Sequence, residues 1–220
     1  HFAAGKPYQD QQSQVALNAD TGATGLALLA FLGAGYHHQS NPYGGVVQTG
    51  LKSLIQSQSE NGNLFLSEDE TSNQSVALYS HGIATIALCE AYGMTLDPEL
   101  REPTERALNY IVATQHPRRG GWRYQPQVGS DTSVTGWMLM ALKSAQMAHL
   151  EVPEHTWAGL ERFMSSAEVA NHPHLFRYNP YAPDTERQRH GRLPSDTMTA
   201  VGLLIRLYTG SNRTDELMIM

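Results

Sequence analysis

The side chains best suited to chemistry occur in two short segments that share one pattern, WRYQP at Trp122–Pro126 and FRYNP at Phe176–Pro180. Asp131 and Asp196 follow these segments, each directly before an apolar run. A carboxyl group in an apolar hollow can act as a general acid or can orient a polar ligand group. We therefore predict a ligand site with Asp131 as its catalytic candidate. The full set of candidate ligand-binding residues is Trp122, Tyr124, Asp131, Tyr178, Asp196, Tyr79 and His81.

The same residues have a plainer interpretation, which the sequence leaves open. Asp20, Asp131 and Asp196 all precede apolar runs, and an aspartate in that position is a favoured helix N-cap. The aromatic side chains of the two segments would then only pack the connections between helices.

A second candidate site lies between Tyr181 and Pro194, where the chain carries residues that the preceding segment lacks. Arg187, Arg189 and Arg192 could bind an anion such as a diphosphate, because guanidinium groups form paired hydrogen bonds with phosphate oxygens. The alternative is a solvated loop.

Composition excludes several classes of function. A net charge of -6 lacks the basic excess that nucleic-acid binding needs. Cys89 is the single cysteine, and the close histidine pairs, His37-His38 and His172/His174, fit surface or capping roles, so we expect no metal site and no cofactor. No apolar stretch approaches the roughly 20 residues of a membrane span. The compartment stays open, since a chain that starts with histidine can be a processed or excised piece.

Internal repeats predict the elements that position these residues. The motif DTGATG at Asp20–Gly25 returns as DTSVTG at Asp131–Gly136 and, more weakly, as DTMTAV at Asp196–Val201. Glycines 25, 82 and 136 each open an apolar run and lie 57 and 54 residues apart. That period accommodates two helices of about 15 residues and two connections. Each repeat is therefore predicted to be a helical hairpin.

Proline marks the second helix of each hairpin, at Asn41-Pro42, Asp97-Pro98 and Val152-Pro153, because proline is tolerated at the first helical position. The first-type helices are apolar nearly all round, whereas the second-type helices are amphipathic. We predict one all-α domain over residues 1–220, with two concentric layers of helices. Its hairpins span about 20–66, 74–126 and 131–180, and an unpaired or truncated hairpin begins at 195.

The stretch Arg106–Trp122 resembles the QW repeat of squalene-hopene cyclases and their relatives, with Gln115 and Gly121-Trp122 at the matching positions, and the chain resembles the wider squalene-cyclase and prenyltransferase repeat family. A degenerate copy runs from Gly50 through Gln58 to Gly62, with Leu64 in place of tryptophan. In the third hairpin, Ala167 replaces the glutamine. The resemblance implies that glutamine and tryptophan tie neighbouring hairpins together. It also implies a partial α/α toroid, in which the first-type helices line a central lumen.

The activity that the resemblance implies is the handling of isoprenoids, but the chain departs from the cyclase DxDD motif. Val128, Gly129 and Ser130 stand before Asp131, so only the last aspartate matches, and a zinc site of the prenyltransferase kind is absent. Three functions remain open. The chain could bind an apolar, isoprenoid-like ligand in its lumen, act as an enzyme on such substrates, or serve as a protein-interaction scaffold. An incomplete ring would be completed by further repeats of a longer chain or by homo-oligomerisation.

Overall fold

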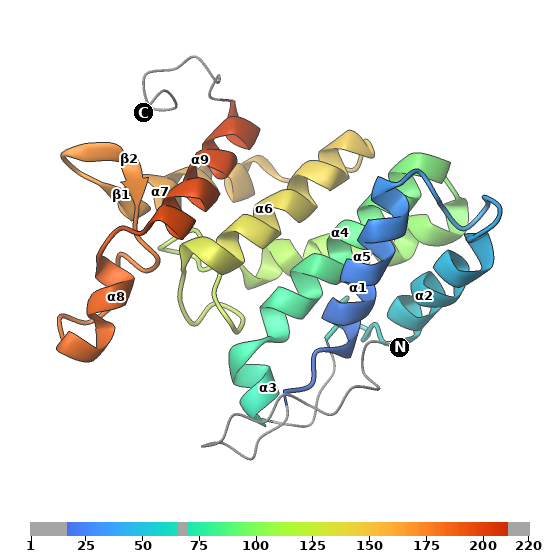
Figure 1. The fold of residues 1–220 in the computed structure, drawn as a ribbon, viewed down its shortest axis with the longest axis horizontal. Coiled ribbons are helices and arrows are strands. Elements are labelled where there is room, and N and C mark those ends of the chain that lie inside the picture. The colour runs from blue at the N-terminus through green and yellow to red at the C-terminus, as the bar shows by residue number, and fades with distance from the viewer. Residues whose placement is uncertain (1–16, 66–69, 211–220) are drawn as a thin grey trace. The chain divides into compact units, whose positions relative to one another are not determined.

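A computed structural model describes residues 17–65 and 70–210 and shows a mostly helical chain (Figure 1). The all-α prediction is confirmed except for one two-stranded sheet. The elements are α1 (Asp20–Gly33), α2 (Gly44–Gln56), α3 (Glu70–Ser75), α4 (Ala77–Thr95), α5 (Pro98–Thr114), α6 (Thr132–Met147), α7 (Glu154–Ala167), β1 (Glu168–Val169), β2 (His172–Phe176), the 3-10 helix η2 (Glu186–Gln188), α8 (Arg189–Arg192) and α9 (Asp196–Thr209).

The chain groups into two compact units. The first contains the residues up to Ala113 together with Met140–Val152, and the second contains Thr114–Leu139 together with the residues from Pro153 on. The prediction of one domain over 1–220, and that of a toroid, stay predictions.

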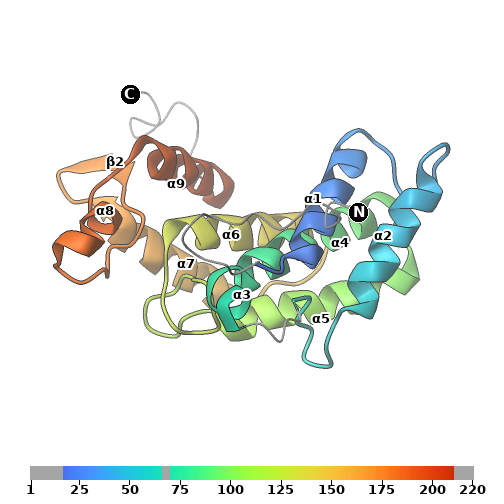
Figure 2. The same ribbon diagram turned by 60° about the horizontal axis from the view of Figure 1, so that its bottom comes forward.

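The first-type helices are α1, α4, α6 and α9, and small residues allow the first two to approach closely. From Ser80 to Cys89 every residue of α4 is buried, as expected of an element covered on more than one side. Gly22 and Gly25 of α1 lie against Ser80 and Ala84 of α4, and an added Cβ at Gly25 would come within 3.0 Å of the Ala84 backbone. Helix α1 therefore packs along α4 inside the first unit (Figures 1 and 2).

The second-type helices α2, α5 and α7 each bury one stripe. In α2 this stripe consists of Val47, Leu51 and Leu54, spaced four and three residues apart. The proline prediction is confirmed for α5, which begins at Pro98. It is wrong by one residue at Pro153, which is the N-cap of α7, and by two at Pro42, since α2 begins at Gly44.

The N-cap prediction holds for one of the three aspartates. Asp131 Oδ1 accepts a hydrogen bond from the Val134 amide at 2.9 Å, in the first turn of α6. It is wrong for Asp196, because Ser195 caps α9 by accepting from the Met198 amide at 3.3 Å, and Asp196 is an exposed residue of the first turn. It is also wrong for Asp20, which follows the N-cap Ala19.

One hydrogen-bonded joint connects consecutive hairpins, and it occurs in both units. In the first unit, Gln58 Nε2 donates to the carbonyl oxygen of Pro103 on α5 at 2.9 Å. In the second, Gln115 Nε2 donates to the carbonyl oxygen of Thr156 on α7 at 3.0 Å. Each glutamine therefore fixes its own hairpin to the second-type helix of the next.

A loop glycine follows each of these glutamines and packs on the same helix one turn further along. Gly62 and Gly120 have φ of +90° and +83°, a conformation that favours glycine. A Cβ on Gly62 would overlap the carbonyl oxygen of Arg106, and one on Gly120 would overlap that of Gly159. These oxygens lie three residues after Pro103 and Thr156, so the two joints share one register.

A bulky apolar residue then enters the next hairpin, and its backbone amide is bound by a side chain of the first-type helix. The Leu64 amide donates to His81 Nδ1 on α4 at 3.1 Å, and the Trp122 amide donates to Thr135 Oγ1 on α6 at 3.1 Å. A third contact repeats the pattern, from Phe176 to Thr199 Oγ1 on α9 at 3.2 Å. Leu64, Trp122 and Phe176 are all fully buried.

The sheet and the short helices η2 and α8 lie in the second unit. Strands β1 and β2 form an antiparallel pair, and Phe176 at the end of β2 packs on Gly202 of α9. Among the helices of residues 17–65 and 70–210, none is both long and apolar enough to cross a membrane.

Candidate functional site

Asp131 is the centre of a polar cluster in the second unit. Its side chain is 0% exposed. Besides the capping bond, Oδ2 accepts from the Tyr178 hydroxyl at 3.3 Å and lies 3.5 Å from Arg123 Nε. The Tyr124 and Tyr178 hydroxyls are hydrogen-bonded to each other. The structure thus brings together three of the predicted ligand residues and adds Arg123.

Burial changes the acidity of this carboxyl group. Removal from water raises the pKa of Asp131 from 3.8 to about 6, while the Val134 amide, Arg123 and Tyr178 act in the opposite direction by favouring the carboxylate. A carboxyl group with this pKa can exchange a proton near neutral pH. The neighbouring Ser130 is buried, and its hydroxyl has no hydrogen-bond partner among the described residues.

The other predicted ligand residues are placed differently. Trp122 is fully buried in the second unit, and Asp196 is exposed on α9. Tyr79 and His81 belong to α4 in the first unit. His81 is also fully buried and connects two segments, because Nδ1 accepts from the Leu64 amide and Nε2 lies 3.2 Å from the Ala107 carbonyl oxygen.

Burial lowers the pKa of His81 from 6.5 to about 3. Its ring is therefore neutral at physiological pH, and its hydrogen bonds are those of a structural residue.

Two of the three arginines of the predicted anion site bind within their own loop. Arg192 pairs with Asp184 at 2.7 Å and donates to the Thr185 carbonyl oxygen at 3.0 Å. Arg189 lies 3.4 Å from Glu186, and Arg187 is exposed. In the part of the chain that the structure describes, no group of three His, Cys, Asp or Glu side chains is placed to hold a metal ion.

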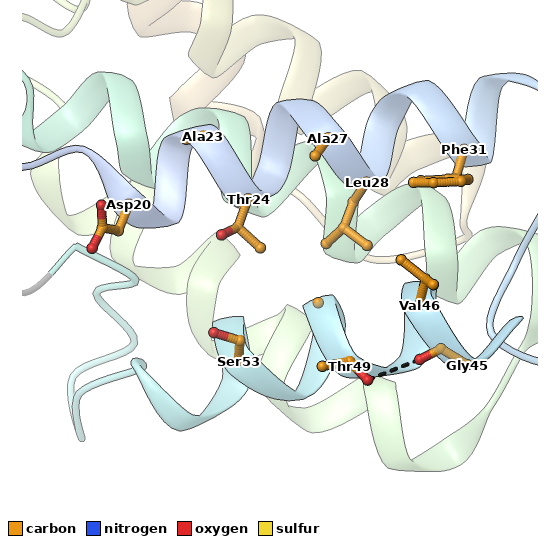
Figure 3. A pocket seen from close by; sticks show the side chains of 11 residues that line it. Asp20, Ala23, Thr24, Ala27, Leu28, Phe31, Gly45, Val46, Thr49 and Ser53 are labelled. Atoms are coloured by element: carbon orange, nitrogen blue, oxygen red, sulfur yellow. Dashed lines mark hydrogen bonds between the residues drawn. The ribbon is translucent and has the colours of Figure 1, made fainter. Parts of the chain in front are cut away.

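A pocket of about 500 Å³ lies in the first unit, between α1 and α2 (Figure 3). Asp20 stands at one end and Phe31 with Val46 at the other, and Thr24 on α1 faces Ser53 on α2 across the middle. We call it the α1–α2 groove. It is lined by Asp20, Ala23, Thr24, Ala27, Leu28, Phe31, Gly45, Val46, Thr49, Gly50 and Ser53.

The α1–α2 groove is largely apolar and open. Val46 on its wall is 59% exposed. On the α1 side, Ala23 and Ala27 carry only small side chains. Pockets of this size hold small apolar ligands or the anchor residues of a partner.

Sequence reasoning did not find this groove. The sequence places Thr24 in register with His81 and Thr135, each directly before a glycine, but this register does not show that the surface beside Thr24 is open.

Searches against family models, curated proteins and solved structures found no match to this chain.

Proposed function

We propose that this chain is a helical-hairpin repeat module of the squalene-cyclase and prenyltransferase type, and that it binds an apolar partner segment in the α1–α2 groove. The repeated glutamine joints support the first part, since they tie hairpin to hairpin in one register. Two concentric layers and a partial α/α toroid are the arrangement that we propose for these hairpins.

One observation carries the binding function. The two later second-type helices each receive a loop from the hairpin before them, at Pro103 and Arg106 of α5 and at Thr156 and Gly159 of α7. The equivalent surface of α2 is a wall of the open groove. An apolar surface that residues 17–65 and 70–210 leave uncovered, while its counterparts are covered, is a site for a partner.

A neutral apolar dye tests this function. Nile red should bind the full-length chain with a blue-shifted, enhanced emission, and Ala27→Trp should lower its affinity at least about tenfold by filling the groove. Ala30→Trp is the matched control, because Ala30 is exposed on the same helix and does not line the groove. Equal dye binding by both variants would contradict the proposal.

A second candidate function is the binding or turnover of an isoprenoid-like ligand at Asp131. The observation in its favour is a buried carboxyl group of pKa about 6 beside two hydroxyl groups and Arg123. If Asp131 is the acid, incubation with squalene should yield cyclised product, and Asp131→Asn should reduce the yield at least about 100-fold.

Asp196→Asn should leave the product yield unchanged, since Asp196 is exposed on α9. Absence of product from the unsubstituted chain, measured by mass spectrometry, would remove the cyclase candidate.

A further inference from the structure

We propose that the α1–α2 groove is a socket for one kind of loop, carried by a helical-hairpin repeat that lies outside residues 1–220. The loop has a glutamine, a glycine four or five residues later, and a bulky apolar residue followed by arginine. This inference rests on the proposed function and names the partner of the same groove.

The groove wall that α2 forms matches the surfaces of α5 and α7 that already hold a loop. On α5 the loop contacts Pro103 and Arg106, three residues apart, and on α7 it contacts Thr156 and Gly159 at the same spacing. Val46 and Thr49 of α2 lie three residues apart in the groove wall. Gly50, the residue after Thr49, lies 57 residues before Ala107 of α5. The same distance in sequence separates Gln58 from Gln115.

The first-type wall matches as well. Thr24, His81 and Thr135 are spaced 57 and 54 residues apart, as are the glycines that follow them. His81 and Thr135 bind the backbone amide of the entering apolar residue. Thr24 lines the groove, and its hydroxyl is the same acceptor type as that of Thr135.

The small residues of α1 provide the remaining contact surface. Ala23 and Ala27 lie 57 residues before Ser80 and Ala84, the α4 residues on which Gly22 and Gly25 pack. The groove therefore presents, in one place, the counterparts of the loop-contacting residues of α5 and α7, of the amide acceptors, and of the small residues on which α1 packs.

Charge specifies the residue after the apolar anchor. In the second unit, Arg123 follows Trp122 and pairs with Asp131, four residues before Thr135. Asp20 stands four residues before Thr24 at the end of the groove (Figure 3). An arginine directly after the anchor would reach Asp20 in the same way.

The apolar anchor residues of this chain's own loops are already buried, and this indicates where the loop in the groove comes from. Leu64, Trp122 and Phe176 are all buried against their own neighbouring helices. Residues 1–16 contain neither an arginine nor a glutamine that precedes a glycine. The required loop is therefore carried by a repeat outside residues 1–220.

A fluorescein-labelled peptide with the sequence of residues 112–126, VATQHPRRGGWRYQP, is the probe, and anisotropy on titration with the full chain is the readout. The peptide should bind, and alanine at its tryptophan should weaken binding at least about tenfold. Ala27→Trp should do the same and Ala30→Trp should not. Asp20→Asn should weaken binding about threefold, with a reduced dependence on salt.

Two results would overturn the inference. No binding at millimolar chain would reject the loop as partner, and if Nile red still occupies the groove the proposed function survives that failure. Peptide binding that appears only after removal of residues 1–16 would show that the chain fills its own socket, which contradicts an occupant from outside residues 1–220. Peptide binding insensitive to Ala27→Trp would place it elsewhere and equally reject the socket.

Discussion

Replacing Asp131 by asparagine should change how stability depends on pH. Asparagine keeps an oxygen that can accept the Val134 amide, so α6 remains capped, but it cannot ionise. In the unsubstituted chain the folded state holds a proton at Asp131 up to pH about 6, whereas the unfolded chain releases it near 3.8. The free energy of unfolding therefore falls as pH rises through this window and is flat above it.

The size of the effect follows from the pKa difference. The shift from 3.8 to about 6 corresponds to about 3 kcal/mol in full. Between pH about 4 and about 8, roughly 2–3 kcal/mol of this should appear as a gain in the stability of Asp131→Asn relative to the unsubstituted chain. Titrations common to both proteins cancel in the difference.

Urea unfolding of both proteins across this pH range measures the difference directly. Asp196→Asn is the matched control, because it removes one exposed carboxyl group and should show no comparable trend. Stability curves of Asp131→Asn and the unsubstituted chain that run parallel from pH about 4 to about 8 would refute the reasoning about burial at Asp131.

Three further predictions concern the joints. Gln115→Ala should destabilise the chain by about 1–3 kcal/mol in urea unfolding, because it removes the donor to the Thr156 and Gly120 carbonyl groups; a loss below about 0.5 kcal/mol would mean that the joint is incidental. Gly120→Ala should prevent folding or lower the free energy of unfolding by more than about 3 kcal/mol, as followed by circular dichroism. Gly33→Ala, at an open helical site, should be neutral or stabilising. His81 has a lowered pKa of about 3, so its contribution to stability is complete above about 6.5 and is lost as pH falls towards 3; an NMR titration that shows its ring protonating near pH 6 would contradict this.

Local sequence patterns predicted the helices well and their exact starts less well. Glycines 25, 82 and 136 located three first-type helices, because small apolar residues at that period encode close packing. Gln58 and Gln115 each bind a backbone carbonyl of the following second-type helix, and the family resemblance that drew attention to them stays a prediction. The N-cap of α9 was predicted one residue too late, at Asp196, because the repeated Asp-Thr pair was used to align the helix starts. Ser195, the residue before it, is an equally good N-cap.

Features that depend on tertiary context were missed. Strand β2 contains Pro173 and lacks an alternating pattern, so nothing local indicated it. The pairing of Arg123 with Asp131 depends on how a loop folds back over α6. The α1–α2 groove was missed because no local sequence pattern shows that a helix surface lacks a covering segment. Comparing the surface of α2 with the occupied surfaces of α5 and α7 identifies it.

Thiol labelling of Ser53→Cys tests most directly whether the groove is open for a partner. Ser53 points into the groove (Figure 3), while the native Cys89 is fully buried with a raised pKa and should stay inert. The account predicts that a maleimide reagent modifies one thiol of the folded Ser53→Cys protein at the rate of an exposed cysteine. Labelling as slow as that of Cys89 would show a covered groove and contradict the account.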